Sequence, residues 1–149
     1  MNLTYNPEIS VEFHFTEIDT FPFPEELIRK WILAIIRNEN KEPGDLNFIF
    51  CSDQYLHQMN VDYLDHDTLT DVITFDYSQD FLNISGDVFI SIDRVKDNCK
   101  DLQLDFLNEL CRIIAHGLLH IIGYDDKQPL SKDVMTSKED HYLSLADFL

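Results

Sequence analysis

The chain has 149 residues, of which 44% are hydrophobic and 26% charged, and this composition predicts one globular domain over residues 1–149 rather than a disordered chain. The net charge of -17 argues against a surface that coats nucleic acid by general attraction, although a bound cation can still invert the field locally. No run of about 18 apolar residues is present, and the start lacks the basic and apolar segments of a signal peptide, so we expect neither a membrane span nor a leader.

The first strand and helix are predicted from apolar spacing. Residues 9–15 alternate as a strand, with Val11, Phe13 and Phe15 on one side. Pro24 followed by two acids is typical of a helix N-terminus. Apolar residues then recur at helical spacing, at Leu27, Trp31, Ala34 and Ile35.

The next elements are a turn, a strand and a helix. Residues 38–45 are polar and predict a turn, and residues 46–51 predict a buried strand. Ser52 or Asp53 can then cap a helix that runs to about Asp62.

A hairpin is predicted after a polar loop over residues 65–70. Two runs rich in β-formers, residues 72–77 and 87–92, are separated by a turn at residues 80–85. The two runs therefore predict a pair of strands joined by a long loop.

Helical patterns fill the rest of the chain. One helix is predicted over residues 94–102, and the clearest helix of the protein over residues 105–122. Gly123 is a natural stop, because a positive φ costs glycine little. The packing face of the long helix is expected to contain Phe106, Leu110, Ile113, Gly117 and Ile121.

A last helix is predicted from Ser131, with Met135, Tyr142 and Leu145 as packing residues. A strand-rich first part followed by a helical half predicts an α+β fold with a small mixed β-sheet packed with helices.

The run HGLLHIIGYDD predicts a metal site. His116 and His120 are four residues apart on a helix, so their rings project from nearly the same side, one turn apart. Gly123 ends the helix and allows Asp126 to return to the same ion. Two imidazoles and a carboxylate leave a fourth position for water, as in catalytic zinc sites.

Three alternatives remain open for this run. A histidine pair at this spacing is more often only helix surface, but these two lie in a strongly apolar stretch, where unpartnered imidazoles would be costly. Asp125 could replace Asp126 as the third ligand. Tyr124 either lines the pocket or packs against its neighbours.

The spacing of the histidines and the following glycine matches that of metzincin proteases, but their general base is missing. Those enzymes have glutamate directly after the first histidine, where this chain has Gly117. A bound zinc ion would still lower the pKa of its water ligand to about 7. Another group must then accept the proton.

The same run resembles the H-G-x-L-H-x-x-G-Y-D-H signature of the YbeY family of bacterial rRNA-maturation endoribonucleases. The resemblance covers roughly residue 46 to the end. Other stretches agree with the family's pattern in the expected order: NVDY at 60–63, TDVITF at 70–75, GDVFIS at 86–91, NELCRIIAHG at 108–117, and Met135 with Glu139.

The resemblance implies a zincin-like fold in which His116 and His120 bind one zinc ion or another divalent metal. It also implies a single-strand-specific endoribonuclease that acts in 16S rRNA 3′-end maturation and ribosome quality control, with rRNA and the small ribosomal subunit as partners. We expect a cytoplasmic protein without disulfides, because its cysteines form an odd set without a C-x-x-C pair: Cys51, Cys99 and Cys111.

The chain departs from the family pattern at two positions. Asp126 stands where the third ligand is usually histidine; a carboxylate binds zinc well, but it weakens Lewis acidity and favours harder ions. Leu64 stands where the family usually has an arginine suspected of contacting phosphate. Arg112, one turn before His116, is a candidate catalytic substitute, and its alternative is a helical pair with Glu109.

Two further questions stay open. His66 lies near Leu64 and is expected to be a solvated loop residue. Thr70 and Asp71 either hold that loop by side-chain capping, or Asp71 orients a ligand histidine.

The rival functions are a hydrolase of peptides or small molecules and a metal-binding, ribosome-associated factor without catalysis.

Overall fold

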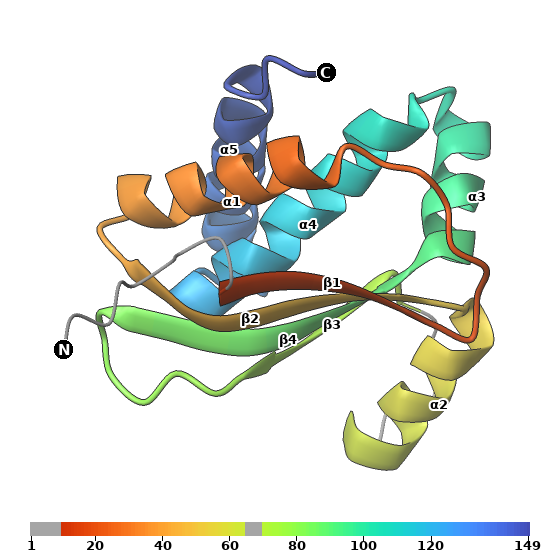
Figure 1. Ribbon diagram of the computed structural model, residues 1–149, viewed down its shortest axis with the longest axis horizontal. Coiled ribbons are helices and arrows are strands. Elements are labelled where there is room, and N and C mark those ends of the chain that lie inside the picture. The colour runs from red at the N-terminus through yellow and green to blue at the C-terminus, as the bar shows by residue number, and fades with distance from the viewer. Residues whose placement is uncertain (1–9, 65–69) are drawn as a thin grey trace, which may run out of the picture.

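The computed structural model describes residues 10–64 and 70–149, in which one sheet carries helices mainly on one face (Figure 1). The strands are β1 (Val11–Thr16), β2 (Glu42–Cys51), β3 (Val72–Asp76) and β4 (Asn83–Ser91). The helices are α1 (Glu25–Asn38), α2 (Asp53–Leu64), α3 (Ile92–Leu102), α4 (Phe106–Ile122) and α5 (Pro129–Ser144). Ile9, predicted at the start of the first strand, and His66 lie outside the described residues.

The sheet has the strand order β1-β2-β4-β3. β1 pairs with β2 and β2 with β4 in parallel, whereas β3 pairs with β4 in antiparallel register, Thr74 opposite Val88. The predicted hairpin is thus confirmed, as is the α+β class with a small mixed sheet. β3 is an edge strand, and its open edge faces the site described below.

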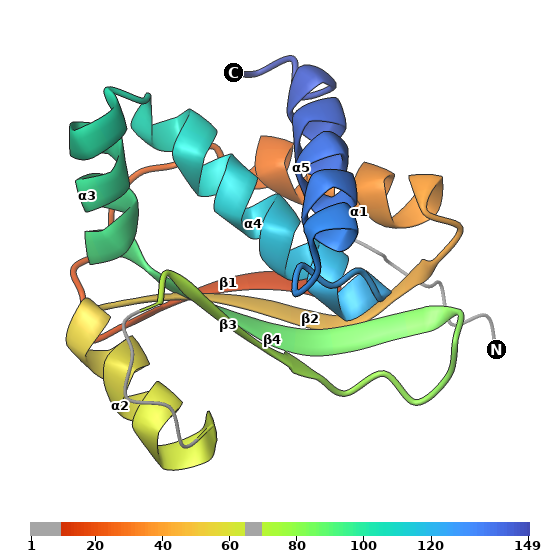
Figure 2. The same ribbon diagram turned by 180° about the vertical axis from the view of Figure 1, so that it is seen from behind.

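The main core lies between the sheet and helices α1, α4 and α5, which cover the same face (Figures 1 and 2). Alternate residues of each strand point into it, as Phe48 and Phe50 of β2 do, and both are fully buried. Burial of such a side chain stabilises the fold by roughly 1.5–3 kcal/mol. This core fixes the position of α4 on the sheet.

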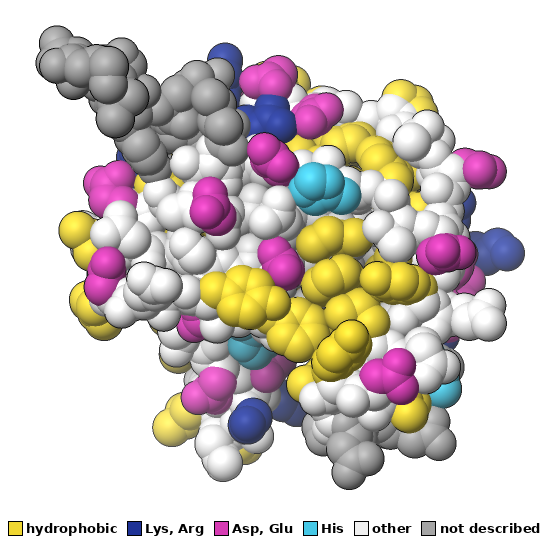
Figure 3. All heavy atoms as spheres, turned by 60° about the horizontal axis from the view of Figure 1, so that its bottom comes forward, with side chains coloured by type: hydrophobic (Ala, Val, Ile, Leu, Met, Phe, Trp, Pro, Cys, Tyr) yellow, Lys and Arg dark blue, Asp and Glu magenta, His cyan; other side chains and the backbone are white. Residues whose placement is uncertain are grey.

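The other face of the sheet is only partly covered. α2 packs on one end of it, where Leu56 and Ile73 are buried. Hydrophobic side chains gather across the remaining surface (Figure 3). Tyr63 is 71% exposed at the end of α2 and contacts the ring of Phe75 on β3.

Helix α4 has clear sequence determinants. The Asp105 side chain accepts a hydrogen bond from the Asn108 amide at 3.1 Å and caps the helix, as the predicted start implies. Gly117 allows close approach to the sheet, since a Cβ there would lie 2.6 Å from Val88 Cγ1. Gly123 ends the helix with φ of 131°, which confirms the predicted stop.

Several boundaries differ from the predictions, and β4 begins at Asn83, inside the turn predicted over residues 80–85. The turn predicted over residues 38–45 is shorter, because β2 begins at Glu42 and pairs through Pro43 with β4 before a register shift. The strand predicted to reach residue 92 ends at Ser91, whose hydroxyl accepts from the Arg94 amide and starts α3. Helix α5 begins at Pro129 rather than at Ser131, which closes a capping box instead.

The packing of α5 confirms two predicted residues and corrects a third. Met135 and Tyr142 are buried, whereas Leu145 is 57% exposed at the end of the helix, where it has left the packed face. All three cysteines are free thiols. Among the described residues, no helix combines the length and the apolar character that a membrane span requires.

Candidate metal centre

The last two turns of α4 and the segment after it bring three potential ligands together. The Nε2 atoms of His116 and His120 lie 3.1 Å apart. Asp126 Oδ2 lies 3.3 Å from the first of these nitrogens and 3.6 Å from the second. In the described part of the chain, these are the residues whose ligand atoms cluster in this way.

These separations fit one tetrahedral cation. Ligands bound about 2.0–2.1 Å from a zinc ion lie about 3.3–3.4 Å from one another. The three observed distances scatter around that value without any change of rotamer. Two neutral imidazoles and one carboxylate also form a donor set that zinc and similar divalent metals accept.

The backbone after α4 decides which aspartate enters the cluster. The amides of Gly123 and Tyr124 both donate to the Leu119 carbonyl and reverse the chain. Asp125 then points away, and its carboxylate accepts from the Lys127 amide at 3.2 Å. A hydrogen bond with Ser131 and that with the Lys127 amide lower the pKa of Asp125. The geometry therefore favours Asp126 over Asp125 as the third member of the cluster.

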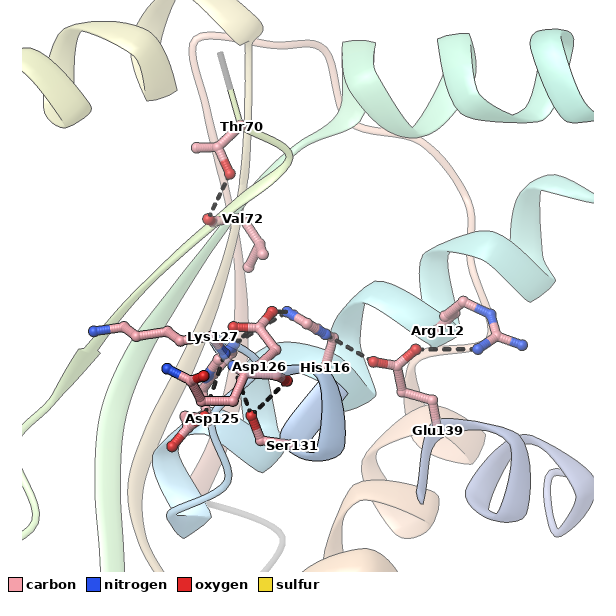
Figure 4. Close-up of polar contacts among 11 residues, drawn as sticks. Thr70, Val72, Arg112, His116, Asp125, Asp126, Lys127, Ser131 and Glu139 are labelled. Atoms are coloured by element: carbon pink, nitrogen blue, oxygen red, sulfur yellow. Dashed lines mark hydrogen bonds and ion pairs between the residues drawn. The ribbon is translucent and has the colours of Figure 1, made fainter. Parts of the chain in front are cut away.

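Glu139 on α5 holds the first histidine from behind. Its Oε2 lies 2.7 Å from His116 Nδ1, and its Oε1 accepts from Arg112 Nη1 at 3.0 Å (Figure 4). A carboxylate in this position keeps the proton on Nδ1 and leaves Nε2 free for a metal. The sequence run Met135…Glu139 resembled a family pattern but gave no role to the glutamate.

Arg112 is occupied by two acids of α5. Its second amino group donates to Asp140 at 2.7 Å, and the pair expected with Glu109 is not formed. The expected pair of Arg112 with Glu109 was therefore wrong. The guanidinium binds acids of α5 instead, because α5 packs within its reach. The catalytic role of Arg112 stays a prediction. Its guanidinium contacts Glu139 and does not line the cavity in front of the cluster.

The two histidines differ in electrostatic setting. Burial lowers the pKa of His116, but the hydrogen bond to Glu139 and the charges of Glu139 and Asp126 outweigh it and raise the pKa. Burial and the neighbouring His116 lower the pKa of His120. The charge of Asp126 and the Tyr124 backbone act in the opposite direction on His120 but do not outweigh these effects. The pKa values of the two imidazoles are therefore shifted in opposite directions.

A cavity of about 570 Å³ opens in front of the cluster. It contains Leu64, the residue in place of the family's arginine, which is 39% exposed. The full lining in the described ranges is Asn60, Leu64, Thr70, Asp71, Val72, Ile73, Thr74, His116, His120, Asp126 and Lys127.

The structure gives Thr70 and Asp71 different contacts. The Thr70 hydroxyl donates to the Val72 carbonyl at 3.2 Å and braces the approach to β3. Asp71 lines the cavity, but Glu139 takes the hydrogen bond to His116 that Asp71 was considered for.

A further glutamate, Glu39, secures the ligand segment and was missed by sequence reasoning; its residue is half-buried, although its side chain is only 7% exposed. It lies at the C-terminus of α1 and accepts hydrogen bonds from the Tyr124 hydroxyl at 2.5 Å and from Lys138 at 3.0 Å. The Tyr142 hydroxyl donates to the same carboxylate. Tyr124 therefore packs against α1 and α5, and it is absent from the cavity lining.

The geometry also accounts for the missing protease base. Because α4 lies so close to Val88 at Gly117, a side chain there would require Val88 or the helix to shift. A glutamate at that position would therefore disturb the packing of α4 on the sheet.

Comparison with known proteins gives a consistent picture. The family model described as Endoribonuclease YbeY matches residues 11–147. A curated relative of that name from Flavobacterium johnsoniae is 43% identical over 145 residues, which cover 97% of this chain and 96% of the relative. Another, from Cytophaga hutchinsonii, is 53% identical over 121 residues, covering 81% of this chain and 85% of the relative.

The fold is also found in a solved structure. The solution structure of TM1509 from Thermotoga maritima superposes with a TM-score of 0.64 and covers 91% of this chain and 88% of its own, at 22% sequence identity. That likeness supports the fold, while the family match over residues 11–147 and the relatives support the membership. The chain belongs to the YbeY family of endoribonucleases.

Proposed function

We propose that this protein is a metal-dependent endoribonuclease that cleaves single-stranded RNA. The observation that carries the proposal is the cluster of His116, His120 and Asp126, whose ligand atoms are spaced as around one tetrahedral cation. The cluster faces a cavity at the open edge of β3, so a polymer can reach it from solvent. The relatives named Endoribonuclease YbeY support RNA as the substrate.

Each residue of the centre has a defined task. His116, His120 and Asp126 would hold one zinc ion or another divalent metal, which supplies a Lewis acid that polarises oxygen and offsets phosphate charge. Glu139 keeps the proton of His116 on Nδ1, and Arg112 holds Glu139 in place as a positioning residue. The nucleophile in this proposal is either water or the RNA 2′-hydroxyl.

The biological substrate in this proposal is the 3′ end of 16S rRNA, and the wider role is quality control of ribosomes in the cytoplasm. The family resemblance supports this assignment, and the name Endoribonuclease YbeY of the relatives supports RNA as the class of substrate. The small ribosomal subunit would then be the partner. A chain charge of -17 fits an enzyme that engages RNA at a local site rather than over its whole surface.

The test is cleavage of a single-stranded RNA by purified protein. We expect cleavage with bound metal, loss of cleavage after chelation and restoration by added Zn²⁺. His116→Ala should lose both metal binding and cleavage, while its fold, followed by circular dichroism, persists. Equal cleavage by the wild type, the chelated protein and the variant would identify a contaminating nuclease and refute the proposal.

A non-catalytic role on the ribosome is the second candidate, and Leu64 is the observation that favours it. An apolar side chain in the cavity cannot contact phosphate where the family usually has arginine. Complementation separates the two roles. If His116→Ala restores rRNA processing in cells although it binds no metal, the protein acts by binding; if it fails to do so, catalysis is required.

A further inference from the structure

The metal cavity contains one cationic side chain among the described residues, Lys127. This residue directly follows Asp126 and is exposed. Its side chain extends on the opposite side of the His116–Asp126 pair from Arg112 (Figure 4). Its charge interacts with that of Asp125, yet no carboxylate in the described ranges forms an ion pair with its ammonium group.

Lys127 determines the sign of the net charge in the cavity once a divalent cation is bound. Asp71 and Asp126 are the two carboxylates of the lining, and together they would neutralise one divalent cation. Lys127 is then the source of net positive charge in the cavity. In a chain of net charge -17, a phosphodiester that approaches the centre would otherwise meet a neutral pocket in an acidic surface.

Other cations near the centre are not available for this task. Arg112 donates to Glu139 and Asp140, and it does not line the cavity. Leu64 lines the cavity but is apolar. A flexible ammonium group at the cavity wall, by contrast, can act as a point charge toward phosphate.

We propose that Lys127 binds a phosphate oxygen of single-stranded RNA beside the metal centre, and so provides the phosphate contact that Leu64 cannot make. This inference rests on the proposed endoribonuclease function. Thr74 lines the same cavity on β3, so the bound phosphate would lie between the open edge of the sheet and the segment after α4.

Salt dependence of binding tests the contact directly. Zinc-loaded protein is mixed with a short fluorescent single-stranded RNA between about 50 and 200 mM salt. Binding is read before cleavage proceeds, and a gel confirms that the RNA is still intact at the time of each reading. The slope of log K against log salt is negative, and a lost phosphate contact decreases its magnitude by about 0.7 for single strands. We expect this decrease for Lys127→Ala and a nearly unchanged slope for Lys127→Arg.

A matched control removes the same charge elsewhere. Lys96→Ala, on an exposed turn of α3 away from the cavity, should keep the wild-type slope. Cleavage should fall between about 10-fold and 100-fold for Lys127→Ala, the range for a lost hydrogen bond to a charged group. Zinc affinity should stay close to that of the wild type in both variants.

Relocating the charge gives a second, independent test. Leu64→Lys is added to Lys127→Ala, which returns one cation to the cavity from α2. We expect the double variant to recover the salt slope and part of the lost cleavage. If Lys127→Ala behaves like Lys96→Ala in slope and in cleavage, the inference is overturned; if the wild type neither binds nor cleaves RNA, it is the proposed function that fails.

Discussion

Glu39 and Glu139 both have side chains that are only 7% and 9% exposed and accept hydrogen bonds from distant parts of the chain, but they stabilise different parts of the molecule. Glu39 accepts from Tyr124, Lys138 and Tyr142, and so joins α1 to α5 and to the segment after α4. Glu139 joins His116 to Arg112 at the metal centre. The Glu39 carboxylate therefore stabilises the packing of the fold, whereas the Glu139 carboxylate contacts a candidate metal ligand.

Two neighbouring residues of α5 take part in these two groups of contacts, one in that of Glu39 and the other in that of His116. Lys138 and Glu139 are consecutive, and a helix turns about 100° per residue. Lys138 therefore points to Glu39 while Glu139 points to His116. One helix thus links a structural network to the candidate metal centre, and the two glutamates predict separable effects on stability and on metal binding.

The largest expected effect is on stability, from Glu39→Ala. Removal of the carboxylate leaves the buried Tyr142 hydroxyl and Lys138 without their acceptor. We expect the free energy of unfolding to fall by about 3 kcal/mol. Urea denaturation of the metal-free protein measures this loss. A loss below about 1 kcal/mol would mean that Glu39 is not the structural clamp described above.

Glu139→Gln should act mainly on metal binding. The amide keeps the volume but no longer fixes the proton on His116 Nδ1, so we expect zinc affinity to fall by about 10-fold to 100-fold. Competition with a zinc-binding dye measures this change. Asp140→Asn is the matched control, because it removes the other partner of Arg112 and leaves His116 supported. Equal loss in both variants would contradict the role given to Glu139.

Two tyrosines that donate to Glu39 allow a finer comparison. Tyr124→Phe and Tyr142→Phe each remove one hydrogen bond and should each cost about 1 kcal/mol of stability. Tyr124 lies two residues before Asp126, whereas Tyr142 lies on α5. We therefore expect zinc affinity to fall only for Tyr124→Phe, and similar affinities in the two variants would show that Glu39 does not position the ligand segment.

The smallest expected effect is the pH dependence of stability. Burial opposes ionisation of Glu39, but the hydrogen bonds from Tyr124, Tyr142 and Lys138 outweigh it and lower its pKa from the ordinary value of 4.5. A lowered pKa in the folded state stabilises above the ordinary value, and this contribution is lost as the pH falls through the folded value. Thermal unfolding between about pH 6 and pH 3 should therefore show a steeper loss for the wild type than for Glu39→Gln.

The sequence predicted the local features of the centre because they depend on short spacings. Four residues between two histidines place both rings on one side of a helix, and a glycine after the helix returns an acid to them. The structure brings His116, His120 and Asp126 together as these rules require. The hairpin of β3 and β4 was predictable for the same reason, since its two strands are close in sequence.

Contacts between distant segments could not be predicted in this way. Glu39 lies 85 residues before Tyr124 and 103 before Tyr142, and no periodicity relates them. The pairing of Arg112 with α5 instead of Glu109 likewise depends on how two helices pack. A glutamate beside an asparagine at the end of a helix carries no sequence signal for burial, so Glu39 was read as part of a polar turn.

The position of α5 also has a consequence for synthesis of the chain. Both histidines and Asp126 are translated before α5, but Glu139 and Lys138 are part of it. A nascent chain therefore carries the HGLLHIIGYDD run before it has the groups that orient His116 and secure Tyr124. We expect a fully oriented centre only after α5 has left the ribosome and packed, so that RNA next to an unfinished chain meets an incompletely assembled nuclease.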